Sequence, residues 1–180
     1  MNAVLALEDG TWYQGVSAGA PGQTEGEVVF NTSMTGYQEV LTDPSYAGQI
    51  VTMTAPQIGN YGVGEGDVES AQLQVAGFVM RDPSPMSSNW RAQGTLRDYL
   101  TRNNIVAIGD VDTRALTKKL RSSGVMRGII ATGSVDPAQL IEKARQRSRC
   151  PPRPHLHRCI GDRFVCRDDG QLGDFLVERS

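Results

Sequence analysis

The sequence predicts a mixed α/β fold in which a β-sheet forms the core and helices pack against it. Two patterns lead to this prediction: the first half of the chain consists mostly of strand-like segments, and the second half alternates helices with strands. With 180 residues, of which 39% are hydrophobic, the chain can bury one substantial core rather than two.

Strand-like segments dominate the N-terminal half of the chain. Residues 4–7 and 12–16 are short strand candidates joined by Glu8-Asp9-Gly10, in which Asp-Gly is a strong signal for a tight turn. Residues 27–33 alternate between two faces and form a third predicted strand, and residues 49–54 form a fourth.

A short helix and a turn are predicted between the third and fourth strands. Thr35 followed by Gln38 resembles a capping box, which would begin a helix that reaches Leu41. Pro44 disfavours the α conformation for the residue before it. The helix therefore ends there, and residues 43–46 fit a type I turn with Asp first and Pro second.

Strands and helices alternate through the remainder of the first 146 residues. The predicted strands cover residues 74–80, 105–108 and 126–132. The predicted helices cover residues 95–102, 113–122 and 137–146, with Asp112 and Asp136 at two of their starts and Gly124 at one end.

The composition of the chain changes abruptly near residue 146. Residues 145–180 hold eight of the fifteen arginines, none of the three lysines, and three closely spaced prolines, without sustained apolar periodicity. Such a segment has too little apolar surface to offset the entropy lost on ordering. We therefore expect residues 1–146 to form one domain and residues 147–180 to form an atypical, Arg/Pro-rich disordered tail.

Charge and hydropathy exclude several classes of partner. The net charge is −2 and the isoelectric point is about 5.7, so no global basic field attracts nucleic acid or an anionic membrane. The longest apolar runs, such as residues 128–131, are far too short to span a bilayer. Residues 1–7 lack the basic region and long apolar segment of an export signal, so we expect a cytoplasmic protein.

All cysteines and histidines lie beyond residue 149, at Cys150, His155, His157, Cys159 and Cys166. A disulfide, a cysteine nucleophile, a histidine base and a Cys/His metal site are therefore excluded from the first 149 residues. The spacing in the tail lacks the paired Cys or His knuckles of structural zinc sites. We predict no metal site, and metal binding by the tail is the minor alternative.

Three further segments carry possible functional signals. The glycine-rich residues 59–66 lack the Gly-Lys-Ser/Thr of a phosphate-binding loop, so we interpret them as a structural loop with positive φ angles. Residues 113–127 concentrate basic side chains, which form either a solvated helix face or a docking face for an acidic protein surface. Residues 26–46 gather hydroxyls and amides around two tight turns, where they can offer hydrogen bonds to a polar ligand.

Residues 26–62 read GEVVFNTSMTGYQEVLTDPSYAGQIVTMTAPQIGNYG, and this run resembles the N-terminal domain of the small chain of carbamoyl-phosphate synthase. The resemblance continues in LEDGTWYQG (7–15), SNWRAQGTLRDYL (88–100), NNIVAIGDVDTRALTKKLRSSGVMRG (103–128) and DPAQLIEKARQ (136–146). The motifs keep the order and spacing of the family over about residues 3–146.

The resemblance implies a fold, a reaction and a partner. The family's N-terminal domain is of the swivelling β/β/α type, and a C-terminal amidotransferase domain hydrolyses glutamine with a Cys–His–Glu triad. The ammonia reaches a large chain, which uses ATP and Mg to form carbamoyl phosphate from bicarbonate for arginine and pyrimidine synthesis. The serine of the family's D-P-S-Y motif reaches toward glutamine and corresponds to Ser45. The N-terminal domain also forms much of the contact with the large chain.

The tail departs from the family pattern. None of its cysteines lies in the G-x-C-x-G-x-Q elbow of the family's nucleophile, so we expect no catalytic residue and no cofactor in this chain, which alone would be inactive. An arginine-rich tail that begins where the resemblance ends suggests a reading-frame change or a truncated gene model. The alternative function is a non-catalytic binding or scaffold module.

Overall fold

The computed structural model describes residues 1–64, 69–70, 72–89, 92–146, 164–168 and 171–175, the last two ranges by their backbone. The chain forms two compact units, Met1–Gln146 and Arg147–Ser180. The second unit contains an antiparallel pair of strands, β10 (Phe164–Asp168) and β11 (Gln171–Phe175). The sequence did not predict this pair, and the rest of the tail predicted to be disordered lies outside the described residues.

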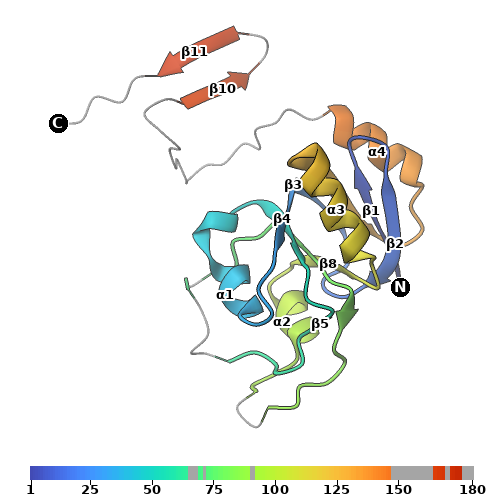
Figure 1. Ribbon diagram of the computed structural model, residues 1–180, viewed down its shortest axis with the longest axis vertical. Coiled ribbons are helices and arrows are strands. Elements are labelled where there is room, and N and C mark those ends of the chain that lie inside the picture. Colours follow the sequence, from blue (N-terminus) through green and yellow to red (C-terminus); the bar gives the residue numbers. More distant parts are fainter. Residues whose placement is uncertain (65–68, 71, 90–91, 147–163, 169–170, 176–180) are drawn as a thin grey trace, which may run out of the picture. The chain divides into compact units, whose positions relative to one another are not determined.

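The first unit has the mixed α/β composition that the sequence predicts (Figure 1). Its strands are β1 (Asn2–Leu7), β2 (Trp12–Ser17), β3 (Gln23–Asn31), β4 (Gln49–Met53), β5 (Gln57–Ile58), β6 (Gly77–Val79), β7 (Asp82–Pro83), β8 (Val106–Gly109) and β9 (Met126–Thr132). Its helices are α1 (Tyr37–Thr42), η1 (Pro44–Tyr46, a 3₁₀ turn), α2 (Leu96–Arg102), α3 (Thr113–Ser123) and α4 (Pro137–Gln146).

Seven of these strands close into a barrel in the order β1-β2-β8-β6-β4-β3-β9. The four strands β3, β4, β6 and β8 run parallel, and antiparallel pairs complete the circuit. Strand β9 closes the barrel because it pairs with β1 on one side and with β3 on the other. The sequence predicted a sheet core, and its closure into a barrel is a finding of the structure.

The barrel interior holds the inner core, a cluster that alternate residues of the strands form. In β1, Leu5 and Leu7 belong to this cluster, whereas Val4 and Ala6 point outward and pack against Leu140 of α4. Such alternation follows from the two-residue period of a strand. The inner core comprises Ala3, Leu5, Leu7, Val28, Ile50, Val79, Val106, Ile108, Val111, Leu116, Leu120, Met126 and Ile130.

Helix α3 covers the end of the barrel at which the parallel strands finish. It follows strand β8, contacts β3 and β4, and inserts Leu116 and Leu120 into the inner core. The predicted buried stripe of this helix is thereby confirmed. Asp112 is also confirmed as its N-cap, since its side chain accepts a hydrogen bond from the amide of Ala115, and Gly124 is the residue at which the helix ends.

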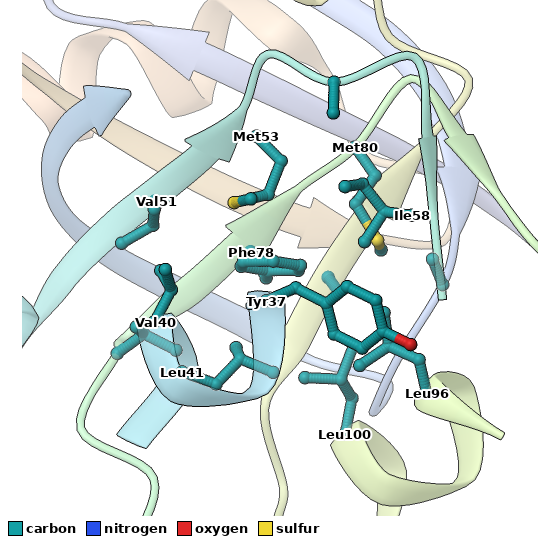
Figure 2. Packing of buried hydrophobic residues seen from close by; sticks show 14 of the residues in the cluster. Tyr37, Val40, Leu41, Val51, Met53, Ile58, Phe78, Met80, Leu96 and Leu100 are labelled. Carbon is teal, nitrogen blue, oxygen red and sulfur yellow. The ribbon is translucent and has the colours of Figure 1, made fainter. Parts of the chain in front are cut away.

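Helices α1 and α2 pack on the outside of the barrel against the parallel strands and form the outer core with them. Figure 2 shows the ring of Tyr37 from α1 among Phe78 of β6, Ile58 and the two leucines of α2, Leu96 and Leu100. Tyr37, Phe78 and Leu100 are fully buried. The apolar outer faces of β4 and β6 therefore fix the position of α1, which precedes the turn at residues 43–46.

Two predicted strands differ from the structure by three residues or more at one end. The strand predicted over residues 27–33 is β3, Gln23–Asn31, because residues 23–28 pair with β9 and the side chain of Asn31 then bends the chain by accepting from the amide of Ser33. The strand predicted over residues 74–80 is only Gly77–Val79. The amide of Gln74 donates instead to the carbonyl of Leu41, at the end of α1.

A charged clasp joins the β1–β2 turn to three other elements. Lys119 of α3 lies 2.6 Å from the carboxylate of Asp9, and Arg127 of β9 lies 2.7 Å from that of Glu8. Arg145 of α4 donates to the backbone carbonyl of Glu8 at 2.9 Å. The turn that the sequence predicted at Glu8-Asp9-Gly10 thus holds α3, α4 and β9 together at this end of the barrel.

Protonation of Asp9 should weaken the clasp. Burial acts to raise the pKa of Asp9, but hydrogen bonds from Lys119 and Thr11 outweigh it, so the pKa is lowered. A carboxyl whose pKa is lower in the folded chain stabilises the fold above its unfolded pKa of about 4, and this contribution is lost as the pH falls through the folded value. We expect Asp9→Asn to flatten the loss of thermal stability in acid.

The measurement is the midpoint of thermal unfolding followed by circular dichroism between about pH 6 and pH 3, a window that spans the aspartate range. Asp82→Asn is the matched control, because Asp82 is exposed and outside the clasp. If the thermal midpoints of the wild type and of Asp9→Asn fall equally as the pH is lowered, the clasp does not contribute to stability.

Gly128 leaves room that the inner core needs. A Cβ atom at this position would lie 2.5 Å from Cγ2 of Val28 and 3.2 Å from Cδ2 of Leu7. Overpacking of a well-packed core costs about 1–3 kcal/mol. We therefore expect Gly128→Ala to lower the free energy of unfolding by about this amount, measured by chemical denaturation.

The steric cause can be isolated with Val28→Ala, which removes the atom that the new methyl group would meet. In that background, Gly128→Ala should cost less than in the wild type, because contacting residues couple in a double-mutant cycle. Additive costs of the two substitutions would contradict the steric explanation.

Candidate functional site

The candidate site is the segment between the end of β3 and the start of β4, residues 31–48. Asn31 organises its beginning: Oδ1 accepts from the amide of Ser33 at 2.7 Å, and Nδ2 donates to the hydroxyl of Tyr46 at 3.0 Å. The backbone carbonyl of Asn31 accepts from Thr54. One side chain at the end of a barrel strand therefore ties together the two turns that the sequence identified as polar.

Ser45 lies on the second of these turns, where its position is fixed. The carboxylate of Asp43 accepts from the amide of Ser45 at 2.7 Å, and the backbone carbonyl of Asp43 accepts from the amide of Tyr46 at 3.1 Å. The latter bond confirms the turn predicted over residues 43–46. Ser45 itself is exposed, so its side chain lies at the surface on a backbone held from both sides.

Helix α1 begins differently from the prediction. Its N-cap is Gly36, in the left-handed conformation with φ 79°, and no side chain caps it, so the capping box of Thr35 and Gln38 is wrong. The hydroxyl of Tyr61 takes that role by accepting from the amides of Gly36 at 2.6 Å and Tyr37 at 3.3 Å. A residue from a distant loop thus satisfies the first amides of the helix.

The same loop holds the rest of α1 in place. The ring of Tyr61 stacks on that of Tyr37, with centroids 4.3 Å apart, and the hydroxyl of Tyr37 donates to the carbonyl of Gly62. Gln38 makes a reciprocal pair with Gly64, donating to its carbonyl at 2.8 Å and accepting from its amide at 2.9 Å. The glycine-rich loop therefore holds helix α1 in place.

Positive φ angles occur in this loop at Gly59 (91°) and Gly62 (77°), which confirms that part of the prediction. At Gly62 an added Cβ would also lie 2.5 Å from the Cβ of Ala92. Glycine is therefore required there both for the backbone conformation and for space. Residues 65–68 lie outside the described part of the chain.

The exposed side chains of the site are small and polar. Thr32, Ser33, Thr35 and Ser45 are exposed, and Met34 between them is 81% exposed. Hydroxyls on turns that a barrel strand and a short helix support can bind a polar ligand through hydrogen bonds. The structure therefore presents the predicted segment as a fixed polar surface.

A separate hollow of about 430 Å³ lies elsewhere on the unit. Its lining includes Val16 of β2, Ala18 just after that strand, Ile58 of β5, and Leu96 and Arg97 of α2. None of its lining residues belongs to residues 31–48. The hollow and the candidate site are thus different surfaces.

Two features are absent from the part of the chain that the structure describes. In that part of the chain, His, Cys, Asp and Glu side chains form no group of three that could hold a metal ion. No helix of the described ranges has both the length and the apolar character to cross a membrane. The side chains of the tail cysteines and histidines lie outside the described residues.

Sequence reasoning identified Asn31, Tyr37, Ser45 and Tyr46 as members of the polar segment but missed Tyr61. Tyr61 lies in a loop that the sequence marked only by its glycines, and its partners are 24 and 25 residues away. A contact between residues this far apart in the sequence cannot be predicted from the local spacing of residues.

The fold and this surface define a mixed α/β barrel domain that presents a fixed polar turn. Residues 5–130 match the family described as "Carbamoyl-phosphate synthase small chain, CPSase domain". The chain is 58% identical over 144 residues to the carbamoyl phosphate synthase small chain of Aquifex aeolicus, an alignment that covers 80% of this chain and 39% of the relative.

Other relatives agree. The chain is 58% identical over 144 residues to the carbamoyl phosphate synthase small chain of Thermotoga maritima, covering 80% of this chain and 37% of the relative. It is 57% identical over 143 residues to that of Rhodopirellula baltica, covering 79% and 37%. The chain therefore belongs to the carbamoyl-phosphate synthase small chain family, and it spans about two fifths of the length of these curated relatives.

Loss of the Tyr61 hydroxyl should loosen α1. Tyr61→Phe keeps the stacked ring but leaves the amides of Gly36 and Tyr37 without their acceptor. A buried donor left unsatisfied costs about 1–3 kcal/mol. We expect a decrease of that size in the free energy of unfolding and faster hydrogen exchange of these two amides.

The control is Tyr99→Phe, because Tyr99 is also half-buried and its hydroxyl makes no hydrogen bond to the residues that the structure describes. It should change the stability little. Equal effects of the two substitutions would contradict a specific role of the Tyr61 hydroxyl.

Proposed function

We propose that this chain is the N-terminal part of the small subunit of glutamine-hydrolysing carbamoyl-phosphate synthase. The enzyme would convert glutamine, bicarbonate and two ATP into carbamoyl phosphate for arginine and pyrimidine biosynthesis. The match over residues 5–130 to the small chain family supports this function. In this proposal the chain docks on the large chain and forms one side of the glutamine site, while the glutaminase nucleophile belongs to another domain of the small subunit.

Ser45 is the residue proposed to contact glutamine. It is exposed, its amide is held by Asp43, and its neighbour Tyr46 is held by Asn31, so the turn cannot shift without breaking these hydrogen bonds. A serine side chain on a fixed, exposed turn can offer both a donor and an acceptor to an amide or carboxylate ligand. Preorganisation of this kind lowers the entropic cost of binding.

The remaining parts of the proposal concern the partner and the fold type. The large chain would bind ATP and Mg, and this chain would contribute neither a cofactor site nor a catalytic residue. We assign the first unit to the swivelling β/β/α type of the family's N-terminal domain. Support for this assignment comes from its closed barrel with helices α1, α2 and α4 packed on the outside.

The test of the glutamine site replaces the matched N-terminal part of the Aquifex aeolicus small chain with residues 1–146 and assays the hybrid with its large chain. Ser45→Ala should weaken glutamine use without abolishing it, since one hydrogen bond is worth about 0.5–1.5 kcal/mol, roughly a two- to tenfold loss in kcat/KM. Ammonia-dependent synthesis should be unchanged.

Ser123→Ala is the matched control, because Ser123 is also an exposed serine but lies at the end of α3, outside residues 31–48. It should leave glutamine use unchanged. The role of Ser45 is refuted if Ser45→Ala has the same kcat and KM for glutamine as the unsubstituted hybrid.

A further inference from the structure

Helix α3 and the strand start after it concentrate positive charge on an acidic unit. Residues 1–146 contain eleven Lys and Arg and fifteen Asp and Glu, a formal charge of −4. Within them, residues 113–127 contain five of the eleven cations and no acid, a formal charge of +5. Such separation of charge on one element is the kind that steers association with an oppositely charged surface.

The five cations divide into two groups. Lys119 and Arg127 are in the clasp, paired with Asp9 and Glu8. Arg114, Lys118 and Arg121 are exposed and form no ion pair with the residues that the structure describes. Their spacing of i, i+4 and i+7 places these three on one stripe of the helix, here called the α3 stripe.

The α3 stripe lies on a firmly held helix. The opposite face of α3 inserts Leu116 and Leu120 into the barrel, Asp112 caps its start, and Lys119 ties its flank to the β1–β2 turn. The three cations therefore keep their spacing in the unbound chain, which lowers the cost of ordering them on binding. Val125, which is 60% exposed, presents an apolar side chain just beyond the helix.

We propose that the α3 stripe binds an acidic surface of the large chain, an inference that rests on the proposed docking function. The observation that carries it is a set of exposed cations, without ion-pair partners among the described residues, on a unit whose net charge repels most acidic surfaces. The pattern fits a protein better than a nucleic acid. Residues 113–127 contain no aromatic residue for stacking on bases, and three cations on a unit of charge −4 neutralise few phosphates.

The test measures association of the full 180-residue chain with the purified large chain by biolayer interferometry over a range of salt concentrations. The main variant is Arg114→Gln/Lys118→Gln/Arg121→Gln, which removes the attraction without adding repulsion, and a second variant places Glu at the same positions. The control carries the same charge change as the second variant at exposed cations off the stripe: Arg81→Glu, Arg97→Glu and Lys143→Glu.

The wild-type association rate should fall as salt rises. At low salt, the Gln variant should associate about tenfold more slowly and the Glu variant more slowly still, whereas the control should stay close to the wild type. Circular dichroism verifies that all chains keep their helices. Because the three positions are exposed, the Gln variant should perturb the fold less than the Glu variant does.

Each other outcome has a definite meaning. Binding of the wild type and the Gln variant at equal rates overturns the stripe and leaves docking intact. No binding of the wild type overturns the docking proposal and this inference with it. If the wild type binds a short DNA duplex and the Gln variant does not, the partner of the stripe is a nucleic acid and not the large chain. If the wild type self-associates in light scattering and the Gln variant does not, the partner is a second copy of this chain.

Discussion

Closure of the barrel by β9 is the constraint on which the rest of the first unit depends. Because β9 pairs with both β1 and β3, the circuit has no free edge, and the inner core must fit within seven strands. Glycines supply the necessary space: Gly26 and Gly128 face each other across the β3–β9 pair, and Gly77 lies against Thr24 and Ile130. These glycines leave room in the interior for neighbouring large residues such as Val28 and Ile130.

A closed barrel also leaves apolar residues on its outer face, and these determine where the helices lie. Val51 and Met53 of β4 and Phe78 of β6 point outward and require cover, which α1 and α2 provide. The position of α1 is thus a consequence of strand alternation. Hydrogen bonds of Asn31 and Asp43 fix the polar turns on either side of α1. The surface that carries Ser45 therefore depends on the barrel behind it.

The sequence predicted features whose causes lie within a few residues. Asp112 as an N-cap, the buried pair Leu116 and Leu120, and the turn at residues 43–46 all depend on local spacing. The start of α1 could not be predicted in this way, because Gln38 bonds to Gly64 instead of capping its own helix. Barrel closure was equally hidden, since it depends on pairing between β1 and β9 across more than a hundred residues. The proposed role of Ser45 rests on family resemblance, because its local geometry alone identifies no ligand.

Helix α3 shows how one element can serve the fold and a surface without conflict. Its inner residues, Leu116 and Leu120, cover one end of the barrel, and Lys119 on its flank belongs to the clasp. Its outer cations are exposed and form no ion pair within the described part of the chain, so their charge contributes little to the fold. Three like charges within two turns of helix repel one another and slightly destabilise it. The proposed contact with the large chain requires this arrangement, in which the inner face of α3 packs on the barrel and its outer face carries exposed cations.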